Sequence, residues 1–170
     1  MKKLFCTFLF SFALAGCVSL PQNAEELKSM SSSNSFVEST SYQTTRSFLD
    51  VNDSLREGSQ RCLNKTQERT FRTPAPGSSI PLLKTTITRY ETRFNASDTA
   101  GQMTMRMIPI VGRAMNEPEE GYIYFVAETK PISGGTTISI YGSSTGDSDL
   151  KATVKSWVQT GEISCPELIR

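Results

Sequence analysis

The sequence predicts a small α+β domain, in which an antiparallel sheet of four to five strands packs against two helices as a two-layer sandwich. From residue 83 onward, β-branched and aromatic residues form four runs that are separated by turn residues. Two other segments place apolar residues at helical spacing. The 170 residues are enough to bury one core, so we expect a single domain.

The predicted strands form a meander after one short initial strand. That strand is expected over 36–43, and the others over 83–94, 102–111, 122–130 and 136–141. Both faces of the run 122–130 are largely apolar, which predicts a central strand. Pro109 indicates an edge, a bulge or an early end of its strand, because proline cannot donate a ladder hydrogen bond.

The first predicted helix precedes the meander. We expect Thr44 or Thr45 to cap it, and we expect it to end near Asn64. Gly58 weakens the prediction, since a glycine inside a helix costs about 1 kcal/mol relative to alanine.

The second predicted helix covers residues 148–160. Asp147 is expected to cap its start and Gly161 to close its end. Its apolar residues form one stripe, which predicts that the helix lies on a sheet face; they are Leu150, Val154, Trp157 and Val158.

The N-terminal segment has the pattern of a secretory signal peptide over residues 1–16. Lys2 and Lys3 precede an apolar stretch that is too short to span a bilayer. Residues 14–17 read Leu-Ala-Gly-Cys, which resembles the lipobox of bacterial lipoproteins. The resemblance implies cleavage before Cys17, a diacylglyceryl thioether on Cys17 and an acyl group on its amine. Stable anchoring to a membrane requires more than one acyl chain.

An ordinary cleavage site is the alternative at this position. Ala13-Leu14-Ala15 fits an A-x-A site, and cleavage after Ala15 would release a soluble protein. The number of cysteines favours lipidation, because a lipidated Cys17 leaves Cys62 and Cys165 as an even pair. In an oxidising compartment such a pair predicts a disulfide. In the lipoprotein class, Val18 in place of aspartate points to the outer membrane, at its periplasmic face.

Residues 17–35 are expected to be the lipidated cysteine followed by a flexible tether, and 36–170 the single periplasmic domain. Residues 29–35 are nearly all serine and asparagine, a composition that buries too little apolar surface to order itself. As a flexible coil, such a segment would have a root-mean-square reach of about 20–25 Å.

Composition excludes several kinds of chemistry. A net charge of +1 does not fit a polybasic nucleic-acid footprint, and the absence of histidine excludes Ser-His-Asp and Cys-His catalysis. No motif indicates a metal site or a cofactor, so we expect a protein that is not an enzyme.

A row of methionines is the candidate ligand or partner face. Met103, Met105 and Met107 share one side of a predicted strand, with Tyr122 and Tyr124 on the next. Thioethers can bind soft metals or form an adaptable apolar surface, but strand periodicity favours packing under a helix.

These observations predict a non-enzymatic binding or assembly module of the cell envelope, acting on an envelope protein, the cell wall or a lipid. The alternative is an accessory domain that binds a small ligand or lipid in an apolar pocket between sheet and helices. An enzyme is a distant third.

Replacement of the proposed lipidated residue tests the anchor. Cys17→Ala should abolish incorporation of labelled palmitate in growing cells, since the acceptor sulfur is gone. Cys62→Ala should keep the label. Label retained by Cys17→Ala would contradict lipidation at this position.

Overall fold

The computed structural model describes residues 19–33, 35–74, 81–115 and 117–168. The predicted signal peptide and Cys17 lie outside these residues. The elements, in chain order, are α1 (Ala24–Ser33), β1 (Val37–Thr44), α2 (Phe48–Gly58), a π-helical turn η1 (Ser59–Leu63), β2 (Lys65–Thr73), β3 (Leu82–Ala96), β4 (Gly101–Val111), β5 (Tyr122–Ile132), β6 (Gly135–Ser143) and α3 (Ser148–Thr160). Within the described ranges, no helix is long and apolar enough to cross a membrane.

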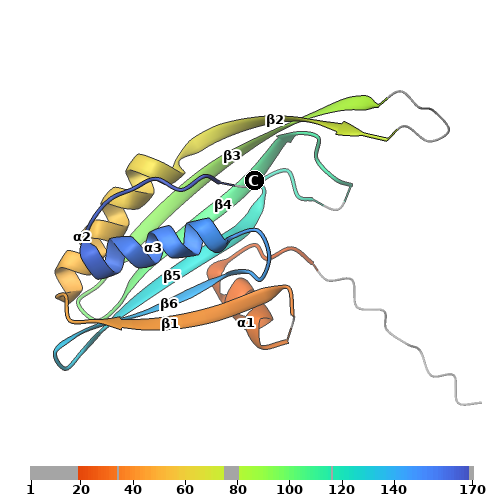
Figure 1. Cartoon of the computed structure of the whole chain (residues 1–170). Coiled ribbons are helices and arrows are strands. Elements are labelled where there is room, and N and C mark those ends of the chain that lie inside the picture. The colour runs from red at the N-terminus through yellow and green to blue at the C-terminus, as the bar shows by residue number, and fades with distance from the viewer. Residues whose placement is uncertain (1–18, 34, 75–80, 116, 169–170) are drawn as a thin grey trace, which may run out of the picture.

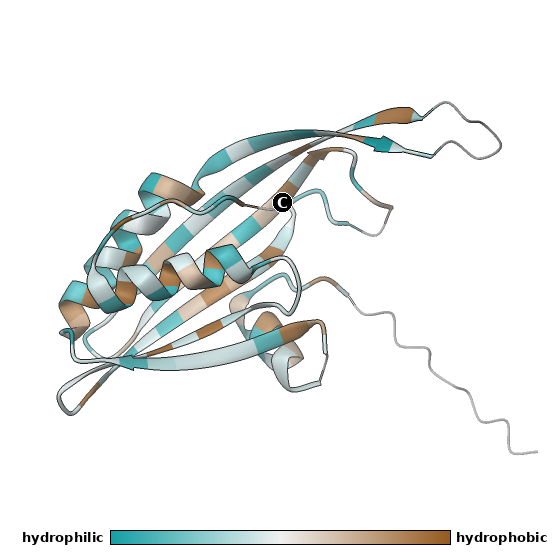
Figure 2. Ribbon diagram, in the orientation of Figure 1, coloured by the Kyte–Doolittle hydropathy of each residue, from teal (hydrophilic) through white to brown (hydrophobic). Residues whose placement is uncertain are grey.

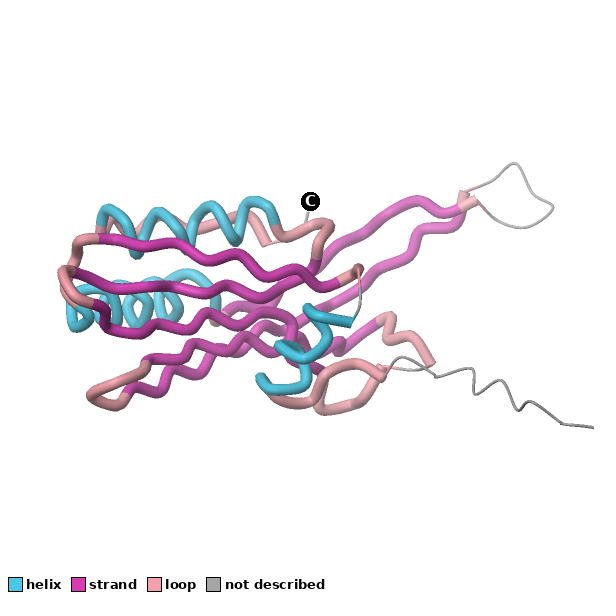
Figure 3. The backbone as a smooth tube through the Cα atoms, turned by 90° about the horizontal axis from the view of Figure 1, so that it is seen from below, coloured by secondary structure: helices cyan, strands magenta, loops and turns pink. Residues whose placement is uncertain are grey.

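All six strands form one antiparallel sheet in the order β1-β6-β5-β4-β3-β2 (Figure 1). Strands β3 to β6 are the predicted meander. The first predicted strand, β1, forms one edge of the sheet by pairing with β6, from Val37 opposite Ser143 to Thr44 opposite Thr136. Helices α2 and α3 cover one face of the curled sheet, and α1 lies against the other (Figure 3). β5 lies inside the sheet, as its two apolar faces predicted.

The predicted α+β class with an antiparallel meander is confirmed, but the number of elements differs. Among the described residues, the sheet has six strands where four to five were expected, and three α-helices are present where two were expected. The additional strand is β2, whose residues KTQERTFRT are polar on both faces. No apolar alternation marks it, and it is held by backbone pairing along the whole of its length with β3.

The prediction of a flexible tether is wrong for residues 24–33, which form α1. Asn23 Oδ1 accepts a hydrogen bond from the Glu26 amide at 2.9 Å, and the Glu26 carboxylate accepts from the Gln22 amide at 2.6 Å. This pair of hydrogen bonds resembles a capping box, except that the Glu26 carboxylate binds the amide of Gln22 rather than that of the cap residue Asn23. Leu27 is buried against β5 and β1, so tertiary packing stabilises a helix that its serines disfavour.

The larger core lies between the sheet and helices α2 and α3. Met103, Met105 and Phe125 on the sheet and Trp157 on α3 are fully buried there. Figure 2 shows apolar residues alternating with polar ones along α2 and α3, as expected for helices with one buried face. The α3 stripe predicted from sequence is all buried: Leu150, Val154, Trp157 and Val158.

Two predicted helix caps differ in detail. Thr44 ends β1, and the cap of α2 is Ser47, whose Oγ accepts a hydrogen bond from the Asp50 amide at 3.1 Å. Asp147 stands at the N-cap of α3, but its side chain makes no capping bond and turns to Tyr124 and Ser143 instead. The predicted end of α3 is confirmed, with Gly161 in the left-handed region at φ 82°.

Pro109 lies at a bulge, one of the three outcomes that its position allowed. The register moves from Val111 opposite Ile87 to Pro109 opposite Thr88, so Ile110 is the additional residue of β4. This bulge comes at the end of the β3–β4 pairing.

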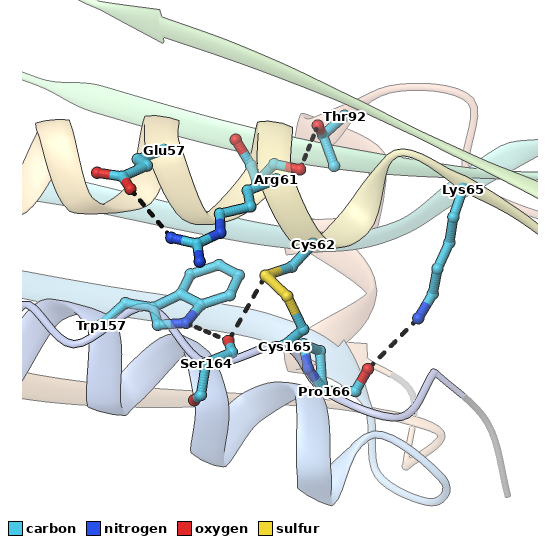
Figure 4. Close-up of a disulfide and its surroundings, with 10 residues drawn as sticks. Glu57, Arg61, Cys62, Lys65, Thr92, Trp157, Ser164, Cys165 and Pro166 are labelled. Atoms are coloured by element: carbon cyan, nitrogen blue, oxygen red, sulfur yellow. Dashed lines mark hydrogen bonds and ion pairs between the residues drawn. A yellow bond between two sulfur atoms is a disulfide. The ribbon is translucent and has the colours of Figure 1, made fainter.

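The predicted disulfide between Cys62 and Cys165 is present (Figure 4). It joins η1 to the C-terminal tail across a separation of 103 residues. In the chain-entropy model a loop of this length stabilises the fold by about 4–5 kcal/mol. The Trp157 indole donates to the Ser164 carbonyl at 2.7 Å, and the Lys65 ammonium to the Pro166 carbonyl at 3.4 Å, so the tail is held on both sides of the bridge.

Gly58 is where α2 meets α3. A Cβ atom added there would lie 2.5 Å from Cε3 of Trp157, so only glycine allows the indole to approach this closely. The low helix propensity of glycine is therefore offset by packing between the two helices.

Gly58→Ala should lower the free energy of unfolding by about 1–3 kcal/mol, despite the higher helix propensity of alanine, because the rigid indole must move. Urea denaturation followed by Trp157 fluorescence measures this change. Gln159→Ala on the exposed side of α3 is the control and should change little. A stabilised Gly58→Ala variant would contradict the close contact.

Candidate binding surfaces

The methionine row is packed rather than open. Met103 and Met105 are fully buried beneath the helices, and Met107 is partly buried at the edge of the same core. The Tyr122 hydroxyl lies 3.9 Å from the Met107 sulfur, and Tyr124 also packs against this core. The five residues are thus brought together, as expected, but they do not form one exposed face. Of the two interpretations, packing under a helix is the one that describes Met103 and Met105.

Tyr124 and Asp147 form a polar contact at the start of α3. The Tyr124 hydroxyl donates to Asp147 Oδ1, and the Ser143 amide donates to Asp147 Oδ2 at 2.7 Å. Burial raises the pKa of the Asp147 carboxyl above its ordinary value, against the opposite effect of these two hydrogen bonds. The contact joins β5, the end of β6 and α3. No local sequence signal links Tyr124 to a residue 23 positions away.

Tyr90 lies beside this contact with an unsatisfied hydroxyl. Its side chain is 1% exposed, its ring centroid is 6.4 Å from that of Tyr124, and its oxygen has no hydrogen-bond partner among the described residues. Burial raises the pKa of Tyr90 and of Tyr124, and raises that of Tyr122 to about 12. All three phenols therefore stay protonated at neutral pH, where none can serve as a base.

An apolar groove lies on the other face of the sheet, beside α1. It has a volume of about 300 Å³, at the lower end of the range for small-molecule sites. Its lining comes from the N-terminal segment, α1, the starts of β1 and β5 and the end of β6: Leu20, Pro21, Leu27, Met30, Phe36, Val37, Tyr122, Ile123, Tyr124 and Ser143. We call these residues the α1 groove.

The N-terminal wall of the α1 groove is held by hydrogen bonds to its backbone carbonyls. The Ile123 amide donates to the Pro21 carbonyl at 2.7 Å. The Arg106 guanidinium donates to the Gln22 carbonyl at 2.8 Å and to the Gly121 carbonyl at 3.1 Å. This groove was not predicted, because the composition of residues 17–35 indicates a tether rather than a helix. The Asn23-x-x-Glu26 pattern, followed by apolar Leu27 and Met30 three residues apart, was the available signal.

A polar cleft of about 410 Å³ is lined by Lys28 of α1, the β3–β4 turn and β5. In it, Glu128 Oε1 accepts from the Lys28 ammonium at 2.6 Å and from the Gln102 amide at 2.9 Å. Burial acts to raise the pKa of Glu128, but these bonds outweigh it and the pKa is lowered. Lys28 and Glu128 are already paired with each other, so the cleft is a weaker candidate for ligand binding than the α1 groove.

A two-stranded arm projects beyond the rest of the sheet (Figure 1). We define the arm as residues 69–74 and 81–86. Its β3 part, Leu82–Thr86, pairs with Thr73–Arg69 of β2, whereas β4 reaches only to Val111 opposite Ile87. Three large apolar side chains on the arm are exposed: Phe71 (41%), Leu82 (56%) and Leu83 (70%). Such a ribbon has little packing of its own and is marginally stable in water.

Comparison of the chain with family models, curated proteins and solved structures finds no match. The candidate surfaces are therefore judged on their geometry and chemistry alone.

Two tyrosine-to-phenylalanine variants test the polar cluster. Tyr90→Phe should raise the free energy of unfolding by about 1 kcal/mol, because it removes a buried hydroxyl that has no partner among the described residues. Tyr124→Phe should lower it by about 1.5–3 kcal/mol, because Asp147 loses a donor. Urea denaturation of the two purified variants gives the comparison. Equal losses in both would show that the Tyr90 hydroxyl is satisfied in solution.

Proposed function

We propose that this protein is a lipoprotein of the outer membrane, anchored at the periplasmic face, that acts as a non-enzymatic binding module for another envelope component. The lipobox-like residues and the signal peptide support the anchor. The single observation that supports binding is the α1 groove, which is apolar and open on a domain whose main core is filled.

The occupant of the groove, in this proposal, is an apolar segment of an envelope protein. Leu27 is buried on the groove floor, and Phe36 at the rim is 72% exposed. A floor of aliphatic side chains with an exposed aromatic at its edge is typical of sites that receive one or two anchor residues of a partner. The volume of about 300 Å³ suits such side chains.

Binding of a small lipid in the same groove is the alternative function. The expected pocket lay between the sheet and its helices, but the space under α2 and α3 is filled by the core that includes Met103, Met105 and Trp157. The proposed lipid site is therefore the groove beside α1. The specific observation in favour of a lipid is that Ser143 is the main polar side chain among the lining residues, apart from the tyrosine hydroxyls.

Site-specific photo-crosslinking distinguishes the two functions. A benzophenone amino acid at Phe36 should yield a protein adduct in native envelopes, because this residue lines the groove. The matched control is the same group at Leu49, which is 73% exposed and lies on α2, away from the groove. We expect no specific adduct at Leu49, and loss of the Phe36 adduct when Cys17→Ala is introduced.

A lipid adduct at Phe36, detected by mass spectrometry in the absence of any protein adduct, would favour the alternative. Indistinguishable adduct patterns at Phe36 and Leu49 would contradict a binding role for the groove.

A further inference from the structure

The short connection between Cys17 and the folded domain limits how far the domain can stand from its anchor. Pro21 and Gln22 are already held to the sheet by hydrogen bonds to Ile123 and Arg106. Pro21 is the fourth residue after Cys17, and a fully extended chain spans at most about 14 Å over that distance. The headgroup layer of a bilayer is itself about 5–8 Å thick. A lipidated Cys17 would thus hold this end of the domain at the membrane surface.

Strand directions identify which other segments lie at that end. Pro21 contacts the start of β5, and Tyr122 at that start pairs with Met107 near the end of β4. The antiparallel order then places the end of β2 and the start of β3 at the same end, further out along the arm. Figures 1 and 3 show the N-terminal segment, the arm and the β4–β5 connection at one end of the sheet.

Most of the exposed large apolar side chains of the described residues are on these segments. Phe71, Leu82 and Leu83 are on the arm, and Ile110, Val111 and Met115 are at or after the end of β4. Figure 2 shows the apolar stretch where β3 begins, at the tip of the arm. Leu49 and Ile132, by contrast, lie at the start of α2 and the end of β5, which are at the opposite end.

The arm combines these apolar residues with positive charge. Its residues include Arg69, Arg72 and Lys84 but no aspartate or glutamate. Phe71 pairs with Lys84 and Leu83 with Arg72, so each face of the ribbon carries an apolar and a basic side chain. Adjacent apolar and basic side chains are typical of segments that lie in the interface of a bilayer with anionic lipids.

We propose that the arm and the end of β4 form a second membrane contact, which lies in the interface of the bilayer that holds the anchor. The inference rests on the lipid anchor of the proposed function. Leu82 and Leu83 reach the acyl boundary, while Arg72 and Lys84 meet lipid phosphates. Penetration is shallow, because β2 is an edge strand and its unpaired backbone groups must stay hydrated. A bilayer is favoured over a protein partner because the apolar residues are spread over two strands and a connection, and because they lie at the end of the sheet to which the N-terminal segment is held.

Fluorescence quenching by brominated acyl chains tests this contact in the lipidated protein. The Leu83→Trp variant is reconstituted in vesicles of phosphatidylethanolamine and phosphatidylglycerol, with and without bromine. We expect the emission added by the new tryptophan to be lost in brominated vesicles. The parent protein corrects for Trp157, which is fully buried in the core. Leu49→Trp is the matched control, since Leu49 is 73% exposed and Leu83 70%, and it should keep its emission.

A double variant tests the basic residues separately. Arg72→Glu with Lys84→Glu, introduced into the Leu83→Trp protein, should weaken the quenching of the added tryptophan. The loss should be greater when phosphatidylglycerol is present than when it is omitted. Both basic residues are exposed, so the variant is expected to fold.

The outcomes separate this inference from the proposed function. Protein that fails to float with vesicles contradicts the lipid anchor, and both proposals with it. Protein that floats but shows equal quenching in the Leu83→Trp and Leu49→Trp variants overturns the membrane contact alone. An unquenched Leu83→Trp variant, together with a protein adduct from a photo-crosslinker at position 83 in native envelopes, would assign the arm to a protein partner.

Discussion

The contact between Trp157 and Gly58 is the constraint on which the arrangement of helices depends. With glycine at this position, the Trp157 indole lies directly against α2 and is fully buried in the core that includes Met103, Met105 and Phe125. The indole N–H then reaches the Ser164 carbonyl, which places the tail where Cys165 meets Cys62 (Figure 4). One missing side chain thus fixes the spacing of two helices and the course of the last residues.

Prediction from sequence succeeded where apolar residues follow a regular period. The apolar stripe of α3 is buried, burial alternates along β4 to β6 much as their spacing indicates, and the cysteine pair forms its bridge. Prediction failed at β2 and α1, where long-range contacts decide the structure. β2 is polar on both faces, and it is a strand only because it pairs with β3 along its whole length. The serine-rich α1 is a helix because Leu27 finds Ile123 and Val126 on the sheet.

The candidate sites followed the same rule. The methionines could be placed on one strand face from their spacing, but whether a helix covered them depended on elements far away in the chain. The α1 groove required residues from the N-terminal segment, β1 and β5 together. The Tyr124–Asp147 contact likewise depends on distant elements, β5, the end of β6 and α3. Tyr124 is the additional residue of a bulge in β5, between Phe125 opposite Met105 and Ile123 opposite Arg106. Neither site corresponds to a contiguous motif.

The pairing of β1 with β6 has a consequence for the order of folding. Val37 meets Ser143 across more than a hundred residues, whereas β2 to β6 each pair with a sequence neighbour. The local hairpins can therefore form early, while the first strand waits for nearly the whole chain, a non-local step that is slow. If the chain crosses a membrane with its N-terminus first, the segment nearest the anchor is among the last to join the sheet. The α1 groove includes Val37, so it is complete only when the whole domain has folded.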